Sequence, residues 1–310
     1  MTTRIIIVGH GAQAETYYSS CSQIPGSIVH LVAGTTFSAT DAESLLNGQA
    51  GDITMLVNLL PWPTMKSVTS VAAEQGIPLL LAPPPAETRE AATRLFQWLK
   101  RHQVQHAVAH PMHFHPGIAR MKESASTGVL GPLTQLEIVY QNAAQDNFPL
   151  CVQSSVLTDT GGWVHYHAID LACWLLGRPR GVQSSETPPG HLCIAYPNNC
   201  TANIRIASAP EGTSNTLDVQ LSGGHGTMHY SGPHTPTNGC SACLTQTLTV
   251  GNRKHTRNLP VPRYAPLTIQ VGYLLQQLKH RQPIAAHNHE TSLDVLGCID
   301  TVRQTDRSHG

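Results

Sequence analysis

A short aliphatic run near the amino terminus constrains the fold more than any other stretch of this chain. Residues 5–8 are Ile, Ile, Ile and Val, and an unbroken β-branched run is typical of a strand buried on both faces of a parallel sheet. The run ends in a G-x-G-x-x-A turn, Gly9-His10-Gly11-Ala12-Gln13-Ala14, which should open a helix over residues 15–21. We therefore expect the chain to begin as an α/β domain.

The same turn predicts a dinucleotide-binding site. Gly9 would allow a tight turn, Gly11 has no Cβ to block a pyrophosphate, and the small Ala14 would let the helix pack closely on the strand. The amides of the first helical turn, including those of Ala12 and Gln13, would then face the phosphates. A plain strand–turn–helix that binds nothing is the alternative.

The end of the second predicted strand bears on which cofactor would bind. Residues 27–33 form that strand, and Thr35 and Thr36 stand where an acidic residue usually holds the ribose diol. A hydroxyl at this place tolerates a 2′-phosphate, so NADP is slightly favoured over NAD, although no arginine follows within reach. The rival interpretation is that nothing binds and that both threonines belong to a turn.

The charge balance excludes several classes of partner. The 310 residues carry 19 Lys and Arg against 19 Asp and Glu, so there is no basic excess to bind nucleic acid or an anionic membrane. Every apolar run is shorter than a membrane span, and the amino terminus has no signal-peptide pattern. We expect a cytoplasmic protein with a small-molecule substrate.

The cysteines and histidines do not predict a metal site. The eight cysteines are scattered, as expected for reduced and mostly buried thiols. Cys240 and Cys243 form a single CxxC pair, which is a poor zinc signature without a second pair. Histidine clusters such as His110, His113 and His115 are explained by histidine replacing scarce lysine and arginine. A metalloprotein remains an alternative, and it would contain stoichiometric zinc.

The pattern of strands and helices predicts two domains. Up to about residue 110, aliphatic strands alternate with helices, which indicates a Rossmann-type doubly wound parallel sheet. The further strands expected there are residues 51–58, 77–81 and 104–109, and the helices are residues 64–76 and 87–102. We place the dinucleotide-binding domain at residues 1–115.

Residues 116–310 predict an α+β domain with a large, mostly antiparallel sheet. Its expected strands are residues 133–141, 191–196, 201–207, 216–221, 226–230 and 243–250, and its helices are residues 117–127, 163–176, 267–280 and 290–303. We expect the final helices to pack back against earlier parts of the chain. One face of the sheet needs a cover, which a homodimer or homotetramer would provide.

Four features give the chain a resemblance to the glucose–fructose oxidoreductase (Gfo/Idh/MocA) family. They are the turn at residues 9–14, the Gly128-Val-Leu-Gly131 segment, residues 161–179 with the pattern H-x-x-D-L-x-x-W-L-x-G-x-P, and the closing pair of predicted helices. The resemblance covers essentially the full chain. It implies NAD(P) bound in the first domain and the oxidation or reduction of sugars, polyols and related carbonyls or imines.

The resemblance also shows where this chain departs from the family. Pro83 and Ala82 stand at the positions of the family's catalytic lysine and the glutamate before it, and His113 replaces a frequent arginine after the domain junction. The nicotinamide would sit near Pro61, Trp62 and Pro83. These changes remove cations from the expected catalytic cleft.

His167 matches the family's general acid/base histidine. On a helix His167, Asp170 and Trp174 share one face, so Asp170 would orient the imidazole and stabilise its charged form. Tyr166 or His113 would help His167 to transfer the proton. The alternative is that His167 only packs within an amphipathic helix.

Two functions therefore remain open at this point. One is an NAD(P)-dependent oxidoreductase with an altered catalytic set, acting on a small carbonyl, imine or sugar-like substrate. The other is a catalytically degenerate or redox-neutral relative that serves as a scaffold or regulatory subunit.

Overall fold

The chain folds into two compact units. The computed structural model describes residues 3–33, 38–47, 53–62, 64–143, 162–185, 191–209, 216–233, 243–250, 253–262, 265–284 and 287–309. Of these, unit 1 contains the residues up to His110 together with Leu267–Leu296. Unit 2 contains those from Pro111 to Pro266 and from Gly297 onward.

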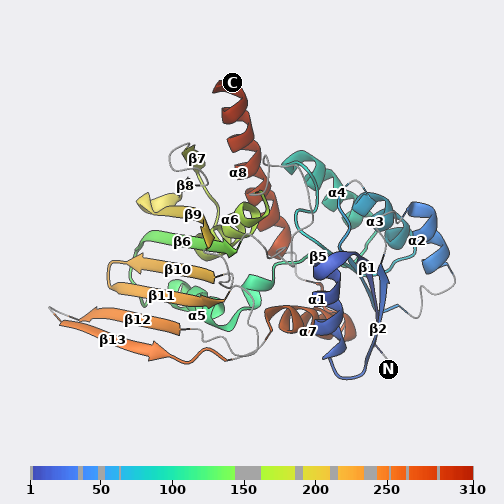
Figure 1. The fold of residues 1–310 in the computed structure, drawn as a ribbon, viewed down its shortest axis with the longest axis horizontal. Coiled ribbons are helices and arrows are strands. Elements are labelled where there is room, and N and C mark those ends of the chain that lie inside the picture. The colour runs from blue at the N-terminus through green and yellow to red at the C-terminus, as the bar shows by residue number, and fades with distance from the viewer. Residues whose placement is uncertain are drawn as a thin grey trace. The chain divides into compact units, whose positions relative to one another are not determined.

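Unit 1 is built on a five-stranded parallel sheet with the order β2-β1-β3-β4-β5 (Figure 1). Its strands are β1 (Thr3–Gly9), β2 (Ser27–Ala33), β3 (Met55–Asn58), β4 (Leu79–Leu81) and β5 (His106–Val108). Ile5 of β1 pairs with Val29 on one side and Met55 on the other. Because β2 and β3 lie on opposite sides of β1, the strand order reverses beside β1, where ligands bind in open α/β sheets.

Helices connect these strands and cover the sheet. They are α1 (Gly11–Ser22), α2 (Ala39–Leu46), α3 (Thr64–Glu74), α4 (Arg89–Arg101), α7 (Pro266–Lys279) and the first part of α8 (His287–His309). Thr268 of α7 donates its hydroxyl to the carbonyl of Ser20 in α1, at 3.4 Å. The backbone amide of Ile284 donates to the side chain of Gln105 at 2.8 Å, so the carboxy-terminal segment packs on unit 1.

Unit 2 is built on an eight-stranded sheet with the order β13-β12-β11-β10-β6-β9-β8-β7. Among the described strands of this sheet, only β6 and β9 pair in parallel, as expected for a mostly antiparallel sheet. The strands are β6 (Leu133–Ala143), β7 (Gly181–Ser185), β8 (His191–Ala195), β9 (Thr201–Ala209), β10 (Thr216–Gly223), β11 (Gly226–Pro233), β12 (Cys243–Val250) and β13 (Arg253–Leu259). The predicted fold class is confirmed for both halves.

Helices cover one face of the large sheet. These are the 3-10 turn η2 (Pro111–Phe114), α5 (Pro116–Ser126) and α6 (Gly162–Leu176), while η3 (Pro197–Asn199) joins β8 to β9. α6 packs against β6 and β9, and α5 packs against β11. Alternate side chains of the central strands, such as Leu217 and Val219 of β10, are buried.

Three elements were missed by the sequence analysis. β13 is nearly all polar and almost fully exposed, so its strand conformation comes from pairing with β12 and not from an apolar pattern. β7 is an edge strand too, and its one pairing within the described ranges is with β8. α2 is short but begins with a capping box, in which Ser38 and Asp41 bond each other's backbone amides.

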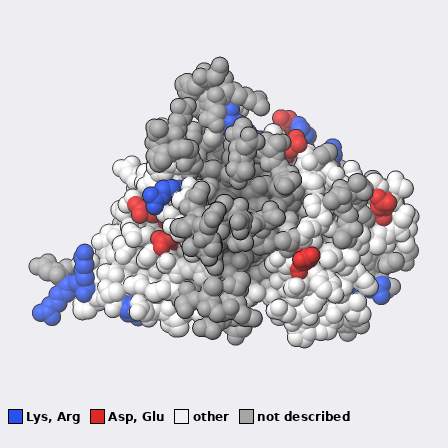
Figure 2. All heavy atoms as spheres, viewed as in Figure 1, with Lys and Arg blue, Asp and Glu red and all other residues white. Residues whose placement is uncertain are grey.

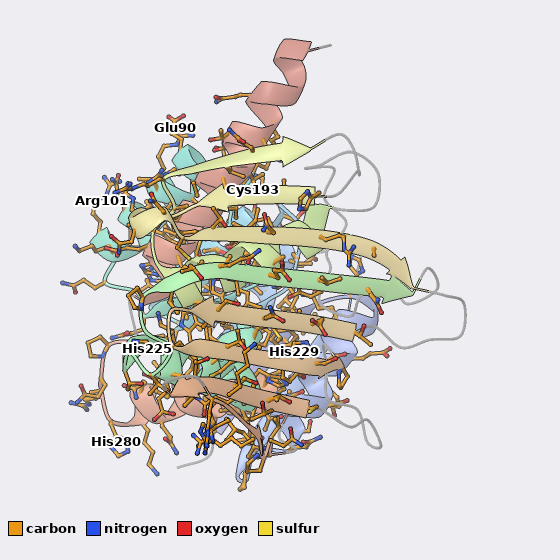
Figure 3. The ribbon with its side chains drawn as sticks, turned by 90° about the vertical axis from the view of Figure 1, so that its left-hand side faces the viewer. Glu90, Arg101, Cys193, His225, His229 and His280 are labelled. Atoms are coloured by element: carbon orange, nitrogen blue, oxygen red, sulfur yellow. The ribbon has the colours of Figure 1, made fainter. Side chains whose placement is uncertain are left out.

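The other face of the large sheet is polar. Figure 3 looks onto this face, on which Cys193 and His229 are labelled, and the pairing places Thr245 beside His229. Figure 2 shows that the charged side chains on the visible described surface are scattered, with one exception. Lys and Arg side chains gather near the tip of the β12–β13 hairpin, where Arg253 and Lys254 are exposed. None of the helices in the described ranges is long and apolar enough to cross a bilayer.

Candidate functional site

The turn between β1 and α1 holds two glycines with different roles. A Cβ on Gly9 would lie 2.8 Å from Cβ of Leu59 and 3.6 Å from Cβ of Ala14, so Gly9 is required for close packing of β1. Gly11 has φ +70°, a conformation that favours glycine. The positive φ therefore falls on Gly11 and not on Gly9, to which the sequence analysis assigned the tight turn.

The amino terminus of α1 is open for an anion. The N-cap residue His10 makes no side-chain bond to the helix, whereas Ser38 and Thr88 cap α2 and α4 with their hydroxyls. A Cβ on Gly11 would meet nothing within 4 Å among the described residues. Backbone donors and open space thus stand together at the carboxyl end of β1, which is the arrangement that a diphosphate needs.

Asn58 organises the neighbouring strand end, a role that the sequence analysis missed. Its buried amide donates to the carbonyl of Met65 at 2.9 Å and to the hydroxyl of Thr69 at 3.1 Å. Its side-chain oxygen accepts the backbone N–H of Leu60 at 3.3 Å. A lone amide that ends an aliphatic strand was the available signal, since a buried Asn must find such partners.

The remaining predicted contacts of the nicotinamide follow neighbouring strands of the same sheet. Pro61 and Trp62 come after β3 and are partly exposed, and Pro83 comes after β4 and is buried. These residues and the β1–α1 turn all belong to the carboxyl edge of the parallel sheet. Thr35 and Thr36 lie outside the described residues.

Unit 2 brings two of the predicted catalytic residues into contact. Nε2 of His113, in η2, lies 3.0 Å from Oδ2 of Asp170, in α6, with the two side chains 6% and 1% exposed. The imidazole of His113 also stacks on the indole of Trp174, with ring centroids 4.6 Å apart and planes at 8°. The face of α6 that carries Asp170 and Trp174 therefore holds His113.

This contact gives Asp170 a partner that helical spacing does not predict. The spacing within α6 predicts that its carboxylate orients His167, and the structure also brings His113 within 3.0 Å of it. His167 and Tyr166 are both buried, and their rings lie edge to face with centroids 6.0 Å apart. Helical spacing could not reveal the partner, because His113 comes from a distant part of the chain.

A second buried histidine, His115, was also missed as a structural residue. Its Nδ1 accepts the N–H of Gly117 at 3.2 Å and so caps α5, which leaves the proton on Nε2. Nε2 donates to the hydroxyl of Tyr230 at 3.1 Å, and that hydroxyl donates to the carbonyl of Pro233 at 3.2 Å. Burial lowers the pKa of His115 to about 4, so it stays neutral and holds η2 and α5 on β11.

Comparison with known sequences gives one partial match. No family model matches the chain. Inositol 2-dehydrogenase 2 from Saccharopolyspora erythraea is 26% identical over 152 residues, which are 49% of this chain and 43% of that relative. The match thus spans less than half of the relative's length.

Comparison with solved structures matches the whole fold. Levoglucosan dehydrogenase in complex with NADH superimposes with a TM-score of 0.76 at 15% identity, covering 99% of this chain and 98% of the other. Aldose-aldose oxidoreductase from Caulobacter crescentus gives a TM-score of 0.74 at 16% identity, with 100% and 99% covered. Biliverdin reductase from Synechocystis sp. PCC 6803, in complex with biliverdin and NADP+, gives 0.69 at 15% identity, with 97% and 98% covered.

Proposed function

We propose that this chain belongs to the glucose–fructose oxidoreductase (Gfo/Idh/MocA) family, which it resembles in sequence motifs, and that it is an NAD(P)-dependent oxidoreductase; its fold and its partial match to an inositol 2-dehydrogenase support this. Its substrate is a small carbonyl, imine or sugar-like compound. The observation that carries the proposal is the uncapped amino terminus of α1, with open space at Gly11, at the point of the sheet where the strand order reverses.

The residues of unit 1 fit a nicotinamide dinucleotide. Gly9, Gly11 and the backbone of residues 12–14 would hold the diphosphate, and Pro61, Trp62 and Pro83 would line the nicotinamide end. A bound nicotinamide supplies or accepts a hydride. The hydroxyls of Thr35 and Thr36 favour NADP over NAD in this proposal.

The residues of unit 2 fit a proton carrier. His113 and Asp170 form a buried imidazole–carboxylate pair, which can hold a proton and return it. His167 and Tyr166 occupy the same helix, one turn before Asp170. With proline at the family's lysine position, a C=N acceptor is favoured over an alcohol, because it needs less help from a cation.

Titration with NADH and NADPH, followed by nucleotide fluorescence, tests the proposal directly. Saturable binding of either cofactor is expected, and the absence of binding of both would remove the redox assignment. The missing lysine favours one alternative, a scaffold or regulatory subunit, which predicts that no variant of the histidines changes any measured turnover.

The Asp170→Asn variant is expected to lower turnover by about 10²- to 10⁴-fold, because it removes the charge that stabilises the protonated His113. The measurement is oxidation of the bound reduced cofactor with a panel of carbonyls and imines. His167→Gln separates the two candidate proton carriers, since a comparable loss there would assign the step to His167. If neither variant changes turnover with any compound of the panel, neither residue transfers the proton.

We further propose that the protein is a homo-oligomer that covers the polar face of the large sheet. Residues such as Val139, Gln220 and Thr245 on that face are only partly exposed, although no helix in the described ranges covers them. Sedimentation equilibrium should give a dimer or tetramer mass. A monomer at micromolar concentration would contradict this assembly.

A further inference from the structure

An aromatic stack lies where α8 begins, within unit 1. The imidazole of His289 stacks on the ring of Phe96 in α4, with centroids 4.4 Å apart and planes at 17°. It also stacks on the imidazole of His106 in β5, at 4.4 Å and 16°. These contacts attach the first turn of α8 to α4 and β5.

Both imidazoles of the stack have a ring nitrogen that is buried without a hydrogen bond. Nδ1 of His106 donates to the carbonyl of Val104 at 2.7 Å, which fixes the tautomer and leaves a lone pair on Nε2. Nε2 of His106 and Nε2 of His289 are shielded from solvent and meet no donor or acceptor in the part of the chain that is described. A proton added to either ring would therefore be held without a partner.

A hydrogen bond to the backbone of His106 partly favours such a charge, but the other groups nearby do not offset it. His110 faces His289 from the end of β5, and its own Nε2 lies 3.0 Å from the hydroxyl of Ser292. From α8 itself, Glu290 is exposed and Asp294 lies 3.9 Å from Arg89 of α4. Burial, with the nearby His106 and His110, lowers the pKa of His289 to about 4, and burial also lowers the pKa of His106.

We propose that the Phe96–His106–His289 stack is an acid-sensitive latch that holds the first turns of α8 on unit 1 and releases them on mild acidification. The direction of the pH dependence follows from which state binds the proton more tightly. When the first turns of α8 detach, the pKa of His289 returns to its ordinary value of 6.5. The imidazole then binds a proton that it does not bind in the closed stack. Falling pH therefore favours the detached state, between about pH 6.5 and pH 4.

The latch lies in a helix that both units share. Residues of α8 up to Leu296 belong to unit 1, and those from Gly297 onward belong to unit 2. Acidification thus acts on the attachment of α8 to unit 1, and the inference does not depend on which reaction the protein catalyses.

Hydrogen–deuterium exchange tests the latch. The amides of residues 291–296 bond to the carbonyls of the first turns of α8, so they report on its detachment. After correction for intrinsic exchange, their opening constant should rise about 25-fold from pH 7.5 to pH 5, given a shift of the His289 pKa from 6.5 to about 4. Amides of β1 and β3 should not change, which separates local release from unfolding of the unit.

Two variants isolate the titrating group. His289→Phe keeps an aromatic ring in the stack, so residues 291–296 should stay protected at pH 7.5 and lose most of the 25-fold rise. His280→Gln removes an exposed histidine of the same unit, labelled in Figure 3, and should keep the full rise. An unchanged rise in His289→Phe, or no rise in the unaltered protein, would overturn the latch.

A direct titration covers the case in which His289→Phe fails to fold. NMR of the unaltered protein should show that the imidazole of His289 remains neutral at pH 5.5. If the signals assigned to His106 and His289 titrate near pH 6.5 while the fold is intact, the latch does not exist.

Discussion

The Gly11→Ala variant is expected to lose cofactor affinity by about 100-fold, which corresponds to about 2.7 kcal/mol. The added methyl group would enter the open space beside the first-turn amides of α1, where a Cβ meets no atom of the described residues within 4 Å. Only the diphosphate would be obstructed. The measurement is the dissociation constant for NADH and NADPH by fluorescence titration.

Gly76→Ala provides a matched control for this variant. Gly76 has the same φ of +70° as Gly11, and a Cβ there also meets none of the described residues within 4 Å. Both variants should lose the same roughly 1–2 kcal/mol of stability from backbone strain, while only Gly11→Ala loses affinity. Equal affinities in the two variants would mean that the β1–α1 turn does not hold the diphosphate.

The Gly226→Ala variant is expected to lose more than about 4 kcal/mol of stability in unit 2. A Cβ on Gly226 would lie 2.1 Å from the carbonyl oxygen of Thr247 and 2.9 Å from Cα of Leu248, both backbone atoms of the paired strand β12. Its φ of +157° adds strain for any other residue. Because backbone atoms cannot move aside, β11 and β12 would have to separate.

Gly224→Ala tests whether this loss comes from steric overlap. Gly224 lies in the same β10–β11 connection, but the nearest atom to its Cβ would be Cδ of Pro132, at an ordinary 3.6 Å. Thermal unfolding should therefore show a midpoint about 10 °C lower for Gly226→Ala and little change for Gly224→Ala. Similar midpoints in both variants would show that the sheet can adjust at this hairpin.

The strands and helices of unit 1 were largely predictable because their local patterns are strong. β2 has the bounds that the sequence predicts, and the amphipathic spacing in α4 places Leu95 and Leu99 in the core. β13 could not be predicted, since its residues have no apolar alternation and its conformation depends on β12. Edge strands of this kind are defined by their neighbour.

In the candidate site, too, the local features could be predicted and the long-range contacts could not. The β1–α1 turn is local, so its glycines could be assigned from the sequence, although packing against Leu59 gave Gly9 a role that no motif specifies. The contact of Asp170 with His113 could not be predicted, because helical spacing reports only neighbours on the same helix.

The sequence by itself determined the two-part architecture and the position of the β1–α1 turn, since both arise from short-range hydrophobic periodicity and backbone chemistry. Only the tertiary structure decided which polar side chains meet. His113 joins Asp170, His115 joins Tyr230, and His289 stacks on His106, in each case across a separation along the chain that no local pattern spans. The physical reason is that burial requires polar groups to find partners in space, wherever the packing of distant elements places them.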